Sequence, residues 1–480
     1  MLPMVSSPRR PRSGRWLAVC AAALALLAPA TPEVAAADTP PDRRYETNAQ
    51  RLHRKGVFCM EELERRDCAI EKFEELLLER TQERELITDG MLRLVKLYEK
   101  EGRPEDVKEM LRRFWDAGHG RTRVGHLIYS TRYLPEDLDA MAGLDIGKVL
   151  DAPISKRVPP DMPEYAFTCD EARREQIEDL WLLRRAQRRA RDKKISTNEA
   201  FAEIAKERRE REARRAQREA EAKAKAKESS APPEPEYAPV FVEHTCDVAK
   251  ALGSFSLARW SRMDVALNHT DPRRSMFMAE IPELEATLER AQRQGVITPV
   301  RDRVWALPGI DFHGHALHLA RLDKDELTVA PAELLAEIAD NSERRKSTLN
   351  RELRALLIKI PVDSHFFGAA TEKTIQDLGF GGMKKGRQKF FQMLLPRPKG
   401  VQIAGVAHEY LGLFIRMPTD NPLKGEMLVG IARRMISNAE EDDGDADMLK
   451  LLDVAQASDK RALLLSYVLS RTQILEMMVQ

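Results

Sequence analysis

The apolar positions of residues 247–480 recur with spacings typical of short strands that alternate with short helices. The first series comprises a strand at 276–281, a helix at 282–294, a strand or hairpin at 296–307, a hairpin at 316–330 and a helix at 332–340. The second comprises a buried strand at 355–361, strands at 401–407 and 410–417, helices at 423–436 and 448–457, a strand at 461–470 and a helix at 472–478. Strands that feed helices twice over indicate an α+β domain at 241–480, with halves at 247–345 and 346–480.

This C-terminal pattern is similar to secreted bacterial α+β domains of unknown function that are built from two ferredoxin-like halves. The similarity rests on the order of elements and carries no motif. It therefore implies a fold and no activity.

Residues 45–150 have the spacing of amphipathic helices and predict an N-terminal helical domain at 38–160. One helix ends at Gly102 and Pro104 opens the next, with Tyr98 on the first and Leu111 on the second. An earlier copy of this pattern follows Ala49, and an insertion interrupts it. The pattern resembles tetratricopeptide repeats. Only two copies are visible, and an ordinary helical hairpin is the alternative interpretation.

Stacked helix pairs of this kind present a concave face to which an extended peptide can bind. The first helix of each pair would line that face, which identifies a candidate partner-binding set: Gln50, His53, Arg54, Arg93 and Lys96. Because the set is mostly basic, an acidic protein or peptide segment is the expected partner. Tyr98 and Leu111 are expected to be buried.

Residues 168–228 are rich in Arg, Glu, Ala and Lys and predict charged helices. Thr168 with Glu171 and Ser196 with Glu199 have the spacing of capping boxes, so two helices should meet at a joint at 194–198. Apolar residues nearly vanish beyond residue 207, which favours a solvated spacer without the seam of a coiled coil. A Pro-rich linker at 229–240 marks a domain boundary.

The N-terminus has the order of a secretory signal peptide at 1–37, with arginines, an apolar run at 17–27 and small residues before Asp38. An uncut membrane anchor is the alternative interpretation. Cleavage would leave a chain without a transmembrane segment, and the Arg-rich charged runs indicate an exported bacterial protein, periplasmic or extracellular. The 78 basic residues balance 77 acidic ones, so nothing in the net charge favours nucleic acid as a partner.

Four cysteines follow the signal peptide, and an oxidising compartment would pair them as two disulfides. Three connectivities are open. The most economical one joins Cys59 to Cys68 and Cys169 to Cys246, because it closes the interruption in the first repeat and the base of the charged segment. The spacings match no zinc motif.

The segment from Asp311 through His313 to His315 is the strongest candidate for chemistry. It resembles the metal-binding opening of the metal-dependent amidohydrolases, and on a single strand the three side chains would share one face. The chain that follows is too short for the barrel of that family. We therefore predict no catalytic residue and no cofactor, with a metal-dependent hydrolase at this segment as the alternative. The favoured function is a non-catalytic cell-envelope protein that binds a protein partner or acts as a scaffold.

Overall fold

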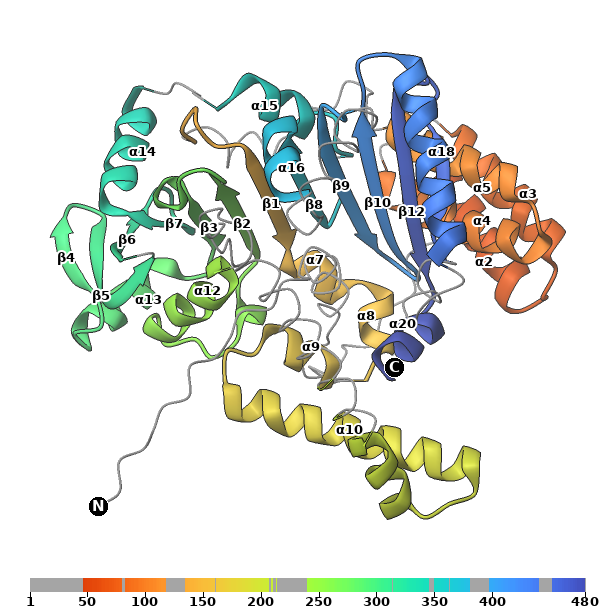
Figure 1. The fold of residues 1–480 in the computed structure, drawn as a ribbon, viewed down its shortest axis with the longest axis horizontal. Helices are drawn as coiled ribbons and strands as arrows, with labels where there is room; N and C mark the ends of the chain where they lie inside the picture. The colour runs from red at the N-terminus through yellow and green to blue at the C-terminus, as the bar shows by residue number, and fades with distance from the viewer. Residues whose placement is uncertain are drawn as a thin grey trace, which may run out of the picture.

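A computed structural model describes residues 46–79, 83–117, 134–159, 161–206, 209, 213, 240–312, 314–344, 349–361, 363–379, 397–439 and 451–479. The described residues form one twelve-stranded sheet with helices on both faces (Figure 1). The fold is thus a mixed α+β one, as expected. The predicted signal peptide and almost all of the predicted Pro-rich linker lie outside the described residues.

The pairings of neighbouring strands in this sheet are antiparallel. From one edge to the other the order is β11 (Asp453–Gln456), β12 (Ala462–Leu469), β10 (Leu411–Pro418), β9 (Gly400–Ala407), β8 (Phe366–Thr371), β1 (Ala140–Asp145), β2 (Arg262–Leu267), β3 (Met276–Glu280), β7 (Glu326–Pro331), β6 (His315–Arg321), β5 (Val304–Phe312) and β4 (Thr298–Arg301). The two series expected from the sequence therefore lie on either side of β1.

Strand β1 differs from the sequence prediction, because residues 121–150 were expected to be helical and Ala140–Asp145 instead form a strand. Ala142 pairs with Val265 of β2 on one side and with Gly368 of β8 on the other. A Cβ atom on Gly143 would lie 2.1 Å from the Asp264 carboxylate and 2.2 Å from the Phe367 ring, so only glycine fits there. The N-terminal part of the chain thus supplies the strand that joins the two halves.

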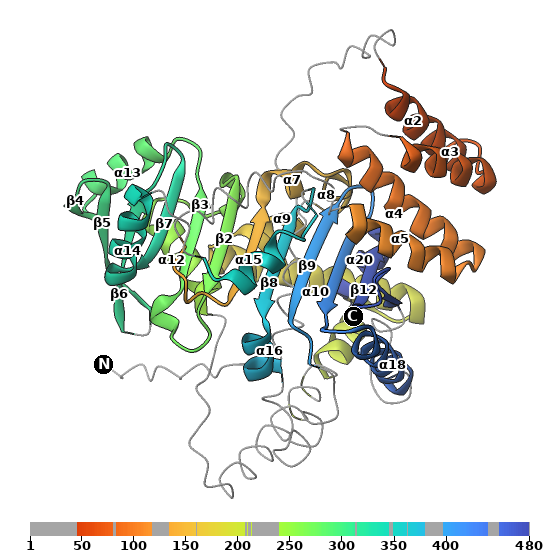
Figure 2. The same cartoon turned by 90° about the horizontal axis from the view of Figure 1, so that it is seen from above.

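Among the described residues, four helices precede β1: α2 (Asn48–Glu61), α3 (Arg66–Leu78), α4 (Arg84–Glu101) and α5 (Pro104–Ala117). Helix α4 ends at Gly102 in the left-handed conformation with φ 66°, and Pro104 opens α5, both as predicted. Tyr98 and Leu111 are buried, also as predicted. Helices α2 and α3 extend outward from the sheet, while α4 and α5 lie closer to it (Figure 2).

The helices share their hydrophobic core with one face of the sheet. Phe114 of α5 stacks on Phe414 of β10 with ring centroids 3.9 Å apart. Helices α14 (Ala332–Arg344) and α15 (Arg351–Leu357) contribute side chains to this same core. The four N-terminal helices therefore do not form a core of their own.

A second core lies on the opposite face of the sheet. It includes side chains from α7 (Ile146–Asp151), α8 (Pro153–Arg157), α9 (Asp161–Phe167), α12 (Val240–Ala251), α13 (Leu284–Arg293) and α20 (Arg471–Val479). Helix α18 (Pro422–Ala439) packs on β11 and β12, and α16 (Glu372–Gly379) follows β8. Short 3-10 turns cover 257–259 and 272–274.

Two elements of the second series differ from the sequence prediction. The segment 355–361, expected to be a buried strand, contains the end of α15, and the expected helix at 448–457 contains β11. Strands β2 and β8 were not predicted. Most of the other expected elements are confirmed, including α13, the β6–β7 hairpin, β9, β10, α18, β12 and α20.

Helix α10 (Glu171–Lys193) runs along the outside of the body (Figure 1). Its N-cap is Asp170, whose carboxylate accepts hydrogen bonds from the backbone of Ala172 and Arg173, so the predicted cap at Thr168 is wrong. The joint is confirmed, because Lys194 adopts the left-handed conformation and Ser196 and Glu199 form their capping box. A second helical stretch at 197–206 packs back on α10.

Both predicted disulfides are present, Cys59 to Cys68 and Cys169 to Cys246. The second one joins the start of α10 to α12 and so fixes the base of the charged excursion. Two disulfides fit a protein exported to an oxidising compartment. Among the helices described, none is both long enough and apolar enough to cross a bilayer.

Candidate functional site

The five residues predicted to bind a partner lie on α2 and α4, but only two of them are exposed. Gln50 belongs to the capping box of α2, and its amide also donates to Glu83 at 2.6 Å. Arg54 forms two hydrogen bonds of 2.9 Å with Glu46. Both side chains reach solvent, and each already has an intramolecular partner.

His53 and Arg93 meet at the carboxylate of Asp89. The His53 Nε2 atom lies 2.6 Å from Asp89 Oδ2, and Arg93 Nε donates to the same oxygen at 2.7 Å. Arg93 also donates to Glu61 at 2.9 Å, and its side chain is only 7% exposed. Arg93 is therefore part of a buried ion cluster that ties α2 to α4, contrary to the exposed position expected from the repeat pattern.

The electrostatics of this cluster favour the charged forms of Asp89 and Arg93. Burial raises the pKa of Asp89, but the hydrogen bond from His53 and the charge of Arg93 outweigh burial and hold that pKa well below its usual range. The Asp89 carboxylate is thus ionised and compensated inside the protein. Such a cluster stabilises one arrangement of helices and leaves little charge for an external ligand.

The turn between β9 and β10 completes the cluster from the sheet side. Glu409 of this turn forms an ion pair with Arg157 of α8, and its backbone nitrogen donates to Asp89 at 3.4 Å. The Arg93 guanidinium lies 3.9 Å from the Glu409 carboxylate. The cluster therefore spans the seam between the N-terminal helices and the sheet, which sequence reasoning did not predict.

Two histidines lie beside this seam, His365 buried and His408 half-buried. The rings of His365 and His408 are 5.1 Å apart, and His365 Nδ1 accepts a hydrogen bond from the backbone of Ala407 at 3.1 Å. Burial lowers the pKa of both imidazoles, to about 3 for His365. The Nε2 atom of His408 is buried without a hydrogen-bond partner among the described residues. Both rings are neutral at ordinary pH and sit inside the packed structure.

Lys96 is buried as well, on the side of α4 that faces β11. It donates to Glu99 at 2.7 Å. Burial, together with the charge of Glu99, raises the pKa of Asp453 on β11 to about 6, and the charge of Lys96 opposes this rise. Lys96 is thus paired within α4 and close enough to β11 for its charge to act on Asp453.

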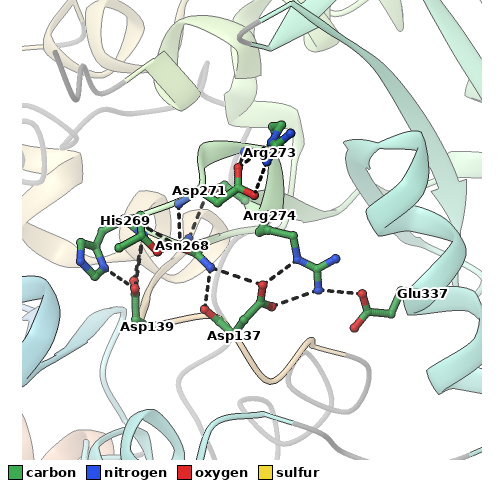
Figure 3. Close-up of polar contacts among 10 residues, drawn as sticks. Asp137, Asp139, Asn268, His269, Asp271, Arg273, Arg274 and Glu337 are labelled. Atoms are coloured by element: carbon green, nitrogen blue, oxygen red, sulfur yellow. Dashed lines mark hydrogen bonds and ion pairs between the residues drawn. The ribbon is translucent and has the colours of Figure 1, made fainter. Parts of the chain in front are cut away.

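A second polar cluster lies where β2 ends and β1 begins (Figure 3). The His269 ring contacts Asp139, and the His269 backbone donates to the same carboxylate at 3.1 Å. Asn268 accepts hydrogen bonds of 2.9 Å from the backbone of Thr270 and Asp271, which shapes the loop after β2. Its amide donates to the carbonyl oxygen of Asp137 at 2.9 Å.

Arg274 extends the cluster shown in Figure 3 to α14, because its guanidinium binds Asp137 at 2.6 and 3.1 Å and Glu337 at 2.6 Å.

In serine hydrolases a buried aspartate orients a histidine that activates a hydroxyl nucleophile. The Asp139–His269 pair could act in this way only if a hydroxyl contacted the imidazole. Thr374 donates its hydroxyl to the carbonyl oxygen of Asp139 at 3.2 Å, and the Thr371 backbone donates to the same atom at 2.9 Å. Both contacts involve the backbone of Asp139 and neither involves the imidazole. The contacts therefore anchor β1 between β2 and β8.

The segment containing Asp311, His313 and His315 is a hairpin turn rather than one strand. Asp311 is near the end of β5, Gly314 takes φ 78° in the turn, and His315 begins β6. Asp311 accepts a hydrogen bond from the Gly314 backbone at 3.1 Å. The shared strand face expected for these residues is wrong, and His313 itself lies outside the described residues. No cluster of metal-ligand residues occurs in the described parts of the chain.

The outer end of the first helix pair carries exposed apolar side chains. We call residues 58–68, which join α2 to α3, the α2–α3 tip. Phe58 is 52% exposed and Leu63 is 46% exposed. The Cys59–Cys68 disulfide links the two ends of the tip. The backbone of Leu63 donates to Phe58 at 3.1 Å, and that of Arg65 donates to Cys59 at 2.8 Å. Phe58 in the last turn of α2 and Leu63 in the loop that follows are thus both exposed on a backbone held by the disulfide and these hydrogen bonds.

Comparison with protein families, with curated proteins and with solved structures finds no match to this chain.

Proposed function

We propose that this chain is an exported, non-catalytic protein of the cell envelope that binds a protein partner through the α2–α3 tip. Support for export comes from the signal-like N-terminus and from the two disulfides. Support for binding comes from one observation, the exposure of Phe58 at the end of α2 and of Leu63 in the following loop, where the Cys59–Cys68 disulfide joins α2 to α3.

The physical reason is preorganisation. Interfaces derive most of their affinity from a few apolar or aromatic anchors, and holding an anchor in place before binding reduces the entropy lost on association. The capped helix α2 and the Cys59–Cys68 disulfide both restrict the backbone that carries Phe58. The tip therefore has the features of a small, rigid docking element.

The test is quantitative capture from envelope extracts with the purified mature chain as bait. Phe58→Asp with Leu63→Asp should reduce capture of the specific partner by about tenfold or more, because two apolar anchors are lost. The matched control is Leu78→Asp with Leu423→Asp, two side chains that are 78% and 67% exposed elsewhere. Circular dichroism and thermal unfolding establish that both variants fold. Equal capture by parent and tip variant would contradict the proposal.

The non-catalytic part of the proposal has its own test, metal analysis of the purified mature chain. A stoichiometric zinc ion that is lost on His313→Ala would overturn it and would favour a metal-dependent hydrolase centred on Asp311, His313 and His315.

A further inference from the structure

Helix α10 has an outward stripe of exposed residues at helical spacing, which we call the outer face of α10. Its members are Leu180, Leu183, Arg184, Gln187, Arg188 and Arg191. These positions are three or four residues apart and so lie along one side of the helix. Three of the six are arginines and none is acidic. A solvated spacer helix would instead mix both signs of charge on such a face.

The rest of α10 is held against the protein. Ile177 is buried, and Trp181 packs against Tyr165 of α9 with ring centroids 4.6 Å apart. Ala186 and Ala190 form a small core with Ala200 and Ile204 of the second helical stretch. Because the buried side, the joint at Lys194 and the Cys169–Cys246 disulfide fix the helix, its outer face is a rigid surface.

Acidic residues on or beside this helix include Glu203 and Asp161, which pair with its basic side chains, and Asp192, an exposed residue four positions after Arg188. Glu203 lies 2.7 Å from Lys193 and 3.9 Å from Arg189. Asp161 binds Arg184 at 2.8 Å near the base. Among the described residues, no carboxylate forms an ion pair with Arg188 or Arg191. The stripe therefore has apolar character at Leu180 and Leu183 and an uncompensated positive charge beyond Arg184.

We infer that the outer face of α10 binds an acidic segment of a partner protein, with carboxylates opposite Arg188 and Arg191 and an apolar side chain against Leu180 and Leu183. Arginine suits this task because its planar guanidinium can donate two parallel hydrogen bonds to one carboxylate. This surface is separate from the α2–α3 tip. Binding of an acidic segment to α10 can therefore be tested independently of the proposed function.

The arrangement favours a protein over an anionic lipid surface. Helices that lie in a membrane interface carry their apolar and charged residues on opposite faces, so that one face can enter the lipid. In α10 the leucines and arginines lie on the same face, one group after the other along the axis. A helix that inserted Leu180 and Leu183 into lipid would have to bury Arg184 and Arg188 to a similar depth, which is costly.

The experiment uses the full mature chain and a fluorescein-labelled peptide with a terminal Leu and Glu residues at helical spacing. Binding is measured by fluorescence anisotropy at low and moderate salt. Arg188→Glu with Arg191→Glu should weaken binding by about tenfold or more, because attraction becomes repulsion. A peptide with Lys in place of Glu should bind this variant more tightly than it binds the parent.

The matched control is Arg290→Glu with Arg293→Glu, which changes two exposed arginines at the same spacing on α13 and leaves α10 intact. This control should bind the acidic peptide like the parent, as should the variant of the α2–α3 tip. An equal loss in the α13 control would overturn the inference, because net charge alone would then explain binding. Sedimentation of the parent with phosphatidylglycerol vesicles, without binding of the peptide, would overturn it in favour of a lipid surface.

Discussion

Asp89 illustrates how a single charged residue is made compatible with burial. Its carboxylate lies within hydrogen-bond distance of His53 and accepts a hydrogen bond from Arg93, and Arg93 also donates to Glu61. Removing one member of such a group leaves a buried charge uncompensated, whereas the intact group is close to neutral in its effect on stability. The arginine is thus a structural residue, although its position on α4 suggested a binding role.

Glu326 of β7 presents the opposite case, a half-buried carboxyl among like charges. Burial raises its pKa to about 7, and the charges of Asp264 and Asp323 add to this rise. The folded state therefore holds its proton more tightly than the unfolded chain, whose pKa is near 4.5. Stability is unaffected below about pH 4.5 and is lost as the pH rises through 7, by up to about 3 kcal/mol.

The raised pKa of Glu326 makes the effect of its substitution depend on pH. Glu326→Gln should raise the free energy of unfolding at pH 8 and leave it nearly unchanged at pH 4.5, because the amide mimics the protonated carboxyl. Urea denaturation at the two pH values measures the difference. Glu289→Gln, at an exposed position on α13, is the control and should change neither value appreciably. Equal stabilisation by Glu326→Gln at both pH values would contradict the assigned cause.

At the residue scale, the sequence identified which side chains are basic but not which of them are exposed and available to a partner. Asp89 and Glu99 lie at helical spacing from Arg93 and Lys96, so those two pairs were visible in the sequence. Their burial was not, because it depends on His53 of α2 and on contacts with the sheet. Glu409 is far away in the chain and reaches Asp89 only through the β9–β10 turn. The exposure of Phe58 was equally unpredictable, because an apolar residue on a helix is expected to be buried.

At the scale of elements, the prediction succeeded where periodicity was sustained and failed for short buried segments. Strand β8 is buried along its whole length, so it shows no alternation of apolar and polar residues. Strand β1 contains Gly143, which is required by the close approach of Asp264 and Phe367 and not by any local preference. The segment 355–361, which contains the end of α15, is a short and mostly apolar run, and such runs are ambiguous between helix and strand.

The two disulfides differ in the length of chain that they close, with separations of 77 and 9 residues. The chain-entropy model assigns about 4 kcal/mol to the longer loop and about 3 kcal/mol to the shorter one. Cys169→Ser with Cys246→Ser should therefore destabilise the protein more than Cys59→Ser with Cys68→Ser. Urea denaturation of the two double variants compares them directly. A larger loss in the second variant would show that local constraint outweighs loop length.

For the whole molecule, the shared core implies that the N-terminal helices and the sheet unfold together. The contact between Phe114 and Phe414 lies inside this core, and Phe414→Ala should cost about 3–5 kcal/mol. Trp115 of α5 and Trp305 of β5 report on opposite parts of the molecule. In variants that retain one of these tryptophans, the two urea transitions should coincide, both with and without the Phe414→Ala substitution. A variant in which the Trp115 transition alone shifts to lower urea would contradict a common core.

The central place of β1 has a consequence for the order in which the protein can fold. The ribosome delivers Asp145 before Arg262 and long before Phe366, so both neighbours of β1 are still unmade when it emerges. At ordinary rates of synthesis the delay from Asp145 to Phe366 is roughly 10 to 45 s. During that time both hydrogen-bonding edges of β1 are open. The nascent chain therefore depends on being kept apart from other chains until β8 arrives to close its sheet.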